Sequence, residues 1–572
     1  SRLACGACHD NVDFATGVIT TSTGTSQHGG TATPVGPALD DGSCSSCHTP
    51  AVIAESHRTE APTANNPIQV AGVVNFDYVI KSVTVEKATG KTTFKFQILM
   101  DGSPVLSMPT TGAAYTANSS QAIAGFNSGP TFYVAFAVAQ DGVATPADFN
   151  AYLSSSLANL IDGTKGTLTA PTDSAGVWTA QFTAASMLVP TATTYPLNPA
   201  TMVTGAMIGN FTQVDFNATK TAGLIDTTTD LGKKWNQIPA GSTTYLNGST
   251  TTKGLYAKTP LQKATASLCT TPTTCTAYSA RRIAVETAKC QSCHEQLGAA
   301  VEFHSGARND ATSCAICHNP NRTSSAWSAN ASTFIHGIHA GTSKTTVDLI
   351  AVGVSGTNST ADVGVPGTGS GGAGLAFSTG KRTIPFSWHR AGTATVPTWN
   401  AAAIAYPGIL KNCDNCHVPN AVNFGTNGAN LLPNLLWSTS TTGTINYATD
   451  ATKSLPRDPV TGASPHANLN STASTAYGSA FSFSATTGVS TPAAATTLVE
   501  SPVSAACFAC HDSSTARLHI TQYGGTIYGT RTAAYSSNTA TTYGGRALQN
   551  NETCLICHGY GRAQDAAVVH AK

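Results

Sequence analysis

The sequence predicts a multidomain protein in which two loop-rich parts with short helices flank an antiparallel β domain. Two observations predict this fold class. Seven copies of the pattern C-x-x-C-H occur, two within residues 1–48, five within 290–558 and none between them. The stretch without the pattern instead alternates apolar and polar residues with a period of two, which is typical of strands. We therefore divide the chain into residues 1–65, 66–276 and 277–572.

The middle part is rich in hairpin signals. "VNFDYVIKSVTVEKATGKTTFKFQILMDG" alternates through Phe76 and Tyr78, turns at Ala88-Thr89-Gly90, and alternates again through Phe94 and Phe96. Further runs of period two are "TFYVAFAVAQDG", "GVWTAQFTA" and "MVTGAMIGNF". We expect an antiparallel β sandwich or barrel here. It is either a packed structural spacer or a domain that holds a flavin or a partner.

The two flanking parts have weak local propensity. Only 10% of all residues are charged, and Ser, Thr, Ala and Gly dominate the composition. The Gly/Ser/Thr-rich stretches 353–380 and 438–500 are predicted to be surface loops or flexible connections. Short helices around the C-x-x-C-H motifs are the regular structure that we expect in the third part.

The motif itself indicates the chemistry. C-x-x-C-H is the attachment pattern of c-type haem: two thioethers bind the porphyrin, and the histidine is the fifth iron ligand. A zinc site or a redox dithiol would not need a histidine after every cysteine pair. The sequence thus predicts seven covalently bound haem c groups with iron, at Cys5/Cys8/His9, Cys44/Cys47/His48, Cys290/Cys293/His294, Cys314/Cys317/His318, Cys413/Cys416/His417, Cys507/Cys510/His511 and Cys554/Cys557/His558. Haem is expected to supply much of the core of the loop-rich parts.

Charge and compartment follow from the same motifs. The formal charge is +1, and seven oxidised haems with their propionates would change it by about −7. No basic stripe suggests nucleic acid as a partner. No apolar run approaches the 18 residues of a spanning helix. Haem is attached outside the cytoplasmic membrane, so we expect that an export signal preceded Ser1 and was removed.

Two cysteines remain outside the motifs. Cys269 and Cys275 lie in "CTTPTTC", with no histidine after the second. In an oxidising compartment a short-loop disulfide is expected, and a redox-active or metal-linked pair is the alternative.

Nine histidines outside the motifs are enough to give each of seven haems a second axial ligand. An iron bound by two imidazoles has no open position for a substrate, so such centres carry electrons. A catalytic reductase would need a vacant position, often marked by a lysine in place of the motif histidine. All seven motifs here end in histidine, which favours electron transfer over an enzyme.

Several segments carry a family resemblance. "RRIAVETAKCQSCHEQLGAAVEFHSGARNDATSCAICHNPNRT", "FIHGIHAG", "NCDNCHVP", "CFACHDSSTARLHI" and "CLICHGYGRAQDAAVVH" resemble, in this order, the second pentahaem domain of the OmcA/MtrC family of outer-surface decahaem cytochromes. "CGACHDNVDFATG" and "CSSCHTP" resemble the last two haem segments of that family's first pentahaem domain. The resemblance implies that the part between them is the family's Greek-key β domain.

The resemblance also implies the distal ligands. His336 and His339 would serve two different haems, and their spacing of three on a helix places both imidazoles near one face. His304, His519 and His570 would complete the five-haem group, and His28 and His57 would serve the first two haems. His389 and His466 are then in excess.

The chain differs from the family in lacking its first β domain, three haems and the lipid-anchored cysteine, so we expect a processed form or a natural short member. At the outer-membrane surface or outside the cell, it would pass electrons to minerals, soluble acceptors or other multihaem cytochromes, with an outer-membrane porin as a further partner. One alternative is a conductive filament of identical subunits, in which the N-terminal haem pair meets the C-terminal haems of the next copy. The other is a reductase with one open iron site.

Overall fold

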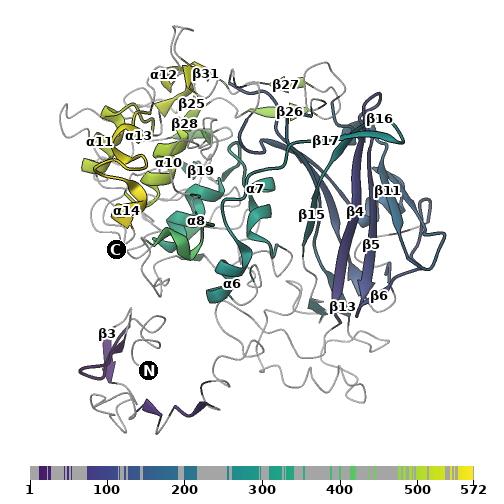
Figure 1. Ribbon diagram of the computed structural model, residues 1–572, viewed down its shortest axis with the longest axis horizontal. Helices are drawn as coiled ribbons and strands as arrows, with labels where there is room; N and C mark the ends of the chain where they lie inside the picture. Colours follow the sequence, from purple (N-terminus) through teal and green to yellow (C-terminus); the bar gives the residue numbers. More distant parts are fainter. Residues whose placement is uncertain are drawn as a thin grey trace.

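The computed structural model describes most of residues 74–214 and 261–340, shorter stretches within 12–53 and at 254–256, and stretches within 352–570, of which the longest are 412–419, 497–511, 514–527 and 552–570. Large β-sheets form one side of the molecule, and short helices lie on the other (Figure 1). Within these described stretches, no helix is long and apolar enough to cross a membrane.

The predicted hairpin is present and forms the centre of the largest sheet. Strands β4 (Phe76–Glu86) and β5 (Thr92–Met100) pair antiparallel, from Phe76 opposite Met100 to Val85 opposite Thr92. Gly90 closes the turn with φ of +73°, and a Cβ atom there would lie 1.9 Å from the carbonyl oxygen of Val189. Only glycine therefore fits this turn position.

Three sheets make up what we call the β region, strands β4 to β17. The first has the order β10-β11-β5-β4-β16-β17, with β6 also paired to β5; the second has the order β15-β12-β8-β9, and the third β14-β13-β7. Their further strands are β6 (Ser103–Pro104), β7 (Phe126–Ser128), β8 (Thr131–Phe136), β9 (Ala151–Ser156), β10 (Gly166–Thr169), β11 (Trp178–Phe182), β12 (Val203–Ile208), β13 (Phe211–Val214), β14 (Gly254–Tyr256), β15 (Gln262–Thr265), β16 (Ser267–Thr271) and β17 (Thr274–Ala277). Helix α4 (Leu157–Ile161) and the 3₁₀ turn η1 (Ala185–Met187) lie between strands.

The first two sheets face each other across an aromatic core. Phe132 of β8 lies with its ring centroid 5.4 Å from that of Phe94 and 5.0 Å from that of Phe96, both on β5. All three side chains are fully buried. Because alternate residues of each strand point into this core, the period-two pattern of the sequence is explained. None of the sheets formed by the described strands closes into a barrel.

One strand pair departs from the antiparallel prediction. β16 runs parallel to β4, with Leu268 opposite Val85, so the expectation of a purely antiparallel β domain is wrong here. The chain leaves β15 in the second sheet and passes through buried Ala266 directly into β16 in the first sheet. A strand that arrives from another sheet is not constrained by a hairpin, so its direction is free to be parallel. The hairpin of β16 and β17 carries the disulfide between Cys269 and Cys275.

The C-terminal region, residues 281–570, has the predicted short helices around its motifs. They are α6 (Thr287–His294), η3 (Ala311–Ser313), α7 (Cys314–Cys317), α8 (Ala331–His339), η5 (Cys413–Asn415), α10 (Pro502–Phe508), α11 (Ser514–Gln522), α12 (Arg531–Ala534), α13 (Leu555–His558) and α14 (Ala566–His570).

Short strand pairs accompany these helices, and several fall within 438–500, where the sequence predicted only loops. The strands are β18 (Thr323–Ser324), β19 (Trp327–Ser328), β20 (Val352–Gly353), β21 (Ser387–Trp388), β22 (Trp399–Asn400), β23 (Trp437–Ser438), β24 (Gly443–Ile445), β25 (Thr475–Tyr477), β26 (Ser482–Ser484), β27 (Val489–Thr491), β28 (Leu498–Glu500), β29 (Gly529–Thr530), β30 (Thr542–Tyr543) and β31 (Arg546–Ala547). Pairs this short have too little periodicity to be found in a sequence.

The N-terminal part contains a three-stranded antiparallel sheet that was not predicted. Its strands are β1 (Val12–Asp13), β2 (Val18–Thr21) and β3 (Gly24–Gln27). Asp13 accepts hydrogen bonds in the turn after β1, including one from the hydroxyl of Thr16 at 2.7 Å. Figure 1 draws this sheet apart from the β region and the C-terminal helices.

Polar contacts join the β region to the C-terminal region. Asn321 donates from its amide nitrogen to the side-chain oxygen of Gln140 at 2.8 Å. Arg531 donates from Nη2 to Oδ1 of Asp141 at 2.6 Å and from Nε to the same oxygen at 3.0 Å. Apolar packing adds to these contacts, since the ring of Phe483 lies edge-on to that of Phe136 at 5.3 Å.

Candidate haem centres

The motifs within the described residues fold into single helical turns. In five of them the backbone N–H of the histidine donates to the carbonyl oxygen of the first cysteine at 2.8–2.9 Å: His48 to Cys44, His318 to Cys314, His417 to Cys413, His511 to Cys507 and His558 to Cys554. The motif Cys290/Cys293/His294 forms the end of α6. One helical turn places residues three and four apart on the same side, so both thiols and the imidazole are directed to a common neighbourhood.

Several cysteines of the motifs are exposed to solvent. The side chains of Cys293, Cys510 and Cys557, each the second cysteine of its motif, are exposed, and so is that of Cys507, the first cysteine of its motif. They lie on the side of each turn that the polypeptide does not cover. A thioether forms with a vinyl group that approaches from outside the chain, so the thiol has to be accessible. These four cysteines are therefore proposed attachment sites at the surface of the polypeptide.

Helix α8 stands between two of these motifs. His339 lies with its ring centroid 6.0 Å from that of His294, and His336 lies 6.0 Å from His417. The helix begins at Ala331 because the side chain of Asn330 accepts a hydrogen bond from the backbone N–H of Ser332 at 2.9 Å. The pair of histidines spaced by three therefore faces two different motifs.

Two further pairs form near the C-terminus. His570 of α14 lies 5.9 Å from His511, and His519 of α11 lies 6.1 Å from His558 of α13, again between ring centroids. Four motif histidines of the C-terminal region thus each face one histidine from outside the motifs. These four outside histidines belong to the set that the family resemblance implies as distal ligands.

The separations fit a metal ion between two imidazoles. A ring nitrogen bound to a first-row metal such as zinc lies about 2 Å from it, and the ring centroid lies about 1 Å further away. Two imidazoles on opposite sides of one iron are therefore expected about 6 Å apart between centroids. All four observed pairs have this spacing, so these residues fit a haem with two histidine ligands.

The ring nitrogens are also oriented for this role. The Nδ1 atoms of four of these histidines donate to backbone carbonyl oxygens at 2.7–3.0 Å: His339 to Ile335, His417 to Ala284, His558 to Gln564 and His570 to Ala566. A carbonyl oxygen only accepts, so Nδ1 carries the proton in each case. That tautomer leaves the lone pair of Nε2 available to a metal and fixes the orientation of the ring.

Burial keeps several of these imidazoles in the neutral form that binds metals. At His511 the burial is only partial. Burial lowers the pKa of His294, His339, His417 and His511 below the ordinary value. The neighbouring His339 lowers the pKa of His294 further, and His570 does the same for His511. At His417 the positive charge of Arg282 adds to the effect of burial.

The fourth motif of the chain has a different described neighbour. The ring of Phe334, from α8, lies 4.4 Å from the ring of His318. Seven predicted site residues lie outside the described residues: Cys5, Cys8, His9, His28, Cys47, His57 and His304. The two excess histidines, His389 and His466, also lie outside them.

Sequence reasoning missed the groups that hold the histidines in place. The carbonyl oxygens of Ala284 and Gln564 carry no signal in their side chains, because any residue offers the same backbone acceptor. Arg281 and Arg282, which precede α6, lie in the first segment that carries the family resemblance. Two adjacent cations in a chain with so few charged residues were the sequence signal that could have indicated a functional role for them.

Comparisons with known proteins complete the description of the site. Residues 282–571 match the family model "Outer membrane cytochrome MtrC/MtrF-like, domains II/IV". Two solved structures are similar at low identity. MtrC from Shewanella baltica OS185 is 13% identical over 97% of this chain and 60% of its own, with a TM-score of 0.35. The outer membrane decaheme cytochrome OmcA is 14% identical over 87% of this chain and 49% of its own, also with a TM-score of 0.35. The chain thus spans about half of each structure's length or slightly more. A search of curated protein sequences finds no match.

Proposed function

The chain belongs to the MtrC/MtrF-like family of outer membrane cytochromes, and on that premise we propose that it conducts electrons along seven covalently bound haems to acceptors outside the cell. Membership in this family agrees with the predicted location at the outer-membrane surface. The seven C-x-x-C-H motifs support the number of haems.

The observation that carries this proposal is the set of four imidazole pairs about 6 Å apart. When haem is bound, an iron held by two imidazoles exchanges one electron with little rearrangement. The protein's part is to hold each pair opposed, with Nδ1 of several rings bound to carbonyl oxygens. We propose the pairs His294/His339, His417/His336, His511/His570 and His558/His519 as axial ligands.

For the remaining three haems we propose ligands on the strength of the sequence. His304 would complete the centre of His318, and His28 and His57 would serve the haems of His9 and His48. Electron transfer is favoured over a reductase because each of the four described pairs would fill both axial positions of a bound haem. The division at residues 65 and 276 and a Greek-key arrangement of the β region belong to the same proposal.

Partners follow from this function. Acceptors would be minerals, soluble shuttles or other multihaem cytochromes, and an outer-membrane porin is a further candidate. The structures that the chain resembles are longer, so these partners are proposed for this chain by family membership alone.

A filament of identical subunits is the second candidate. Figure 1 draws the N-terminal strands apart from the described strands of the β region and from the C-terminal helices. Such head-to-tail contacts generate open filaments when the rotation between copies does not close. Electron microscopy of the native protein separates the two forms: regular filaments would support assembly, and compact single particles would support a discrete surface cytochrome.

The proposed function is tested on the purified native protein. Mass spectrometry should give the mass of the chain plus seven haems, and the ferric absorption spectrum should show low-spin iron without a high-spin component. Replacing Cys290 should leave the haem of that motif bound by a single thioether or lost. A chain without covalent haem, or with a high-spin component in the native state, would contradict the proposal.

A further inference from the structure

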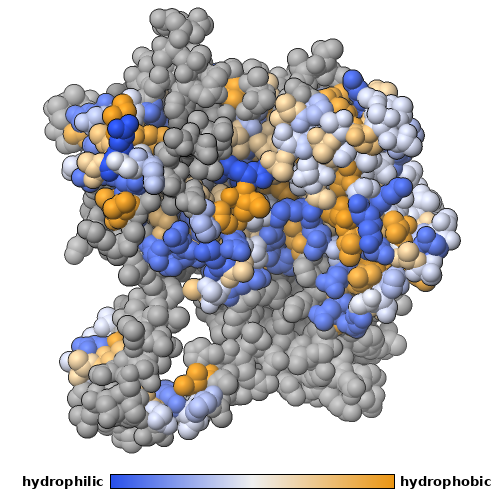
Figure 2. All heavy atoms as spheres, in the orientation of Figure 1, coloured by the Kyte–Doolittle hydropathy of each residue, from blue (hydrophilic) through white to orange (hydrophobic). Residues whose placement is uncertain are grey.

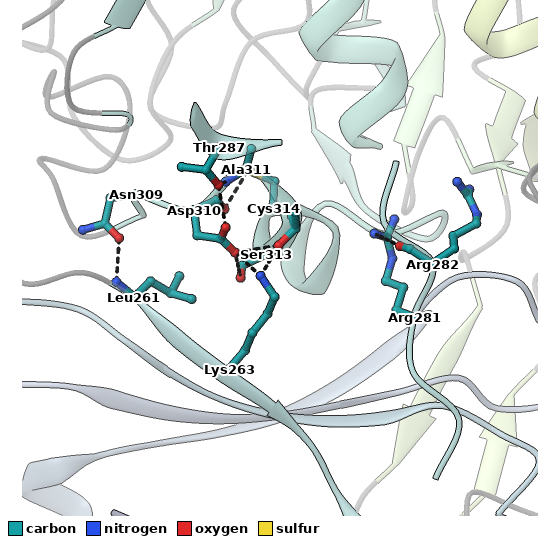
Figure 3. Close-up of polar contacts among 11 residues, drawn as sticks. Leu261, Lys263, Arg281, Arg282, Thr287, Asn309, Asp310, Ala311, Ser313 and Cys314 are labelled. Atoms are coloured by element: carbon teal, nitrogen blue, oxygen red, sulfur yellow. Dashed lines mark hydrogen bonds and ion pairs between the residues drawn. The ribbon is translucent and has the colours of Figure 1, made fainter. Parts of the chain in front are cut away.

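Two arginines share one buried carboxylate where the β region meets the C-terminal region. Nε of Arg281 lies 2.5 Å from Oδ1 of Asp148, and Nη2 of Arg282 lies 3.7 Å from Oδ2 of the same residue. Asp148 is only 6% exposed. Two guanidinium groups against one carboxylate leave an excess positive charge at this place. Figure 3 shows the two arginine side chains leaving the chain in different directions.

The excess charge is localised on Arg282. Its Nε atom is buried and has no hydrogen-bond partner within the described part of the chain. An unsatisfied buried donor destabilises the fold, and more so when it is charged. A guanidinium binds carboxylates through two parallel N–H groups, so the open edge of Arg282 matches a carboxylate that the described residues do not supply.

The backbone ties Arg282 to one particular motif. Two residues later, the carbonyl oxygen of Ala284 accepts from Nδ1 of His417 at 3.0 Å and from the backbone N–H of Val418 at 3.2 Å. Val285 forms a β-bridge with His417. The chain at Arg282 is therefore held beside the turn of Cys413 and Cys416.

We propose that Arg282 holds a propionate of the haem attached to Cys413 and Cys416, and that its positive charge raises the reduction potential of that haem. This inference rests on the proposed function, since it requires haem at that motif. Haem propionates are the carboxylates that such a site meets. Reduction adds one negative charge to the iron, so a nearby fixed cation favours the reduced state.

Other charges near this motif should affect the reduction potential of its haem less. Asp414 is exposed, and Lys289 reaches the carbonyl oxygen of Asp414 through an exposed hydrogen bond of 2.7 Å. Water and salt screen exposed charges, whereas a buried charge is screened much less. Arg282 is thus the residue that positions the propionate and sets the potential, although it touches neither the iron nor its ligands.

The experiment needs a label for one haem among seven. His336 faces His417, so His336→Ala should make this haem alone high-spin and give it its own absorption band. In that background, Arg282→Gln is compared with the unchanged Arg282 by spectroelectrochemical titration of the high-spin band. We expect a three- to tenfold fall in the equilibrium constant for reduction, where tenfold is about 59 mV for a one-electron couple.

Two comparisons make the result specific. Lys289→Gln removes a cation from the same neighbourhood whose hydrogen bond to Asp414 is exposed, and should change the equilibrium constant for reduction by less than twofold. Arg282→Lys keeps the positive charge but not the two parallel N–H groups of the guanidinium. It should lower the equilibrium constant for reduction by less than Arg282→Gln does. An unchanged constant in Arg282→Gln, an equal fall in Lys289→Gln, or an equal fall in Arg282→Lys would each overturn the inference.

Covalent haem is counted by mass spectrometry in every variant. A native protein with no haem at Cys413 and Cys416 contradicts the proposed function itself, whereas a loaded haem with an unshifted potential contradicts only the role of Arg282. If Arg282→Gln fails to retain its haems, Arg282→Met, which suits a buried position better, replaces it in the same titration.

Discussion

Single residues decide the state of each proposed iron ligand. His339 and His570 both donate Nδ1–H to the carbonyl oxygen of the residue four positions earlier in their own helices. A helical histidine with this bond presents Nε2 away from the helix, because the two ring nitrogens point in different directions. The carbonyl oxygens of Ile335 in α8 and Ala566 in α14 therefore help to orient the ligands.

The residue-by-residue assignment of pairs can be tested by removal of one imidazole. His336→Ala should convert the haem of Cys413/Cys416 to high-spin iron, and His339→Ala should convert the haem of Cys290/Cys293, with seven covalent haems kept in both. The ferric absorption spectrum measures the high-spin fraction. Fully low-spin spectra in both variants would contradict the assignment.

Asp310 is the most strongly perturbed carboxylate of the junction. Burial raises its pKa, but the Lys263 ammonium, 2.5 Å away, and hydrogen bonds from Ser313 and Thr287 outweigh burial and lower the pKa to about 2. Figure 3 shows Lys263 of β15 and Thr287 of α6 converging on this carboxylate. Asp310 thereby connects the β region to the turns of two motifs.

A lowered folded-state pKa has a definite effect on stability. The charged form of Asp310 stabilises the fold by about 2 kcal/mol above pH 4, and this contribution is lost as the pH falls toward 2. Asp310→Asn should therefore lower the free energy of unfolding by about that amount at pH 7 and by little at pH 2. Denaturant unfolding at pH 7 and at pH 2 measures this change in the free energy of unfolding. Asp77→Asn, at an exposed position of β4, is the control, and an equal loss there would refute the argument.

At the scale of elements, α8 is the shared support of two proposed centres. It is nine residues long, carries both His336 and His339, and buries Gly337 and Ile338. A helix this short has little stability of its own, so its start depends on the cap at Asn330. Because one helix serves two motifs, damage to it should affect two haems together.

The cap offers a direct test of this dependence. Asn330→Ala should destabilise α8 by about 1 kcal/mol, whereas Asn330→Asp should retain the cap. In the alanine variant, heating should raise the high-spin signal of two haems at a lower temperature than in the aspartate variant. Identical temperature profiles for the two variants would show that the cap does not support the centres.

At the scale of the whole molecule, the β region serves as a base for the C-terminal region. Arg531 and Asp141, far apart in the sequence, form an ion pair across the junction, in which the Asp141 side chain is 3% exposed and that of Arg531 21%. Figure 2 shows mixed apolar and polar residues over the visible face of both regions. The two regions are therefore connected by several specific contacts, and not by the chain alone.

The ion pair of Arg531 and Asp141 should stabilise the contact between the β region and the C-terminal region. Arg531→Gln leaves Asp141 buried without its cation, a change that typically costs about 3–5 kcal/mol. We expect faster proteolytic cleavage between the regions while the covalent haem content stays constant. Restoration by the second change Asp141→Asn would confirm the pair as the cause, and cleavage at the native rate in Arg531→Gln would contradict it.

The sequence by itself determined the features that are formed by residues close together in the chain. C-x-x-C-H is complete within five residues, so its turn and its cysteines and histidine follow directly from the chain. The hairpin of β4 and β5 also follows, because its strands alternate and its turn is local. The set of distal histidines came from their number together with the family resemblance.

The tertiary structure decided which distant residues meet. That His336 faces His417, and that His339 faces His294, depends on how α8 packs between two motifs, and no local pattern encodes that packing. The parallel entry of β16 and the sharing of Asp148 by Arg281 and Arg282 are of the same kind. Contacts across long stretches of chain are fixed only when the whole core is assembled, because each is one of many pairings that the local sequence allows equally well.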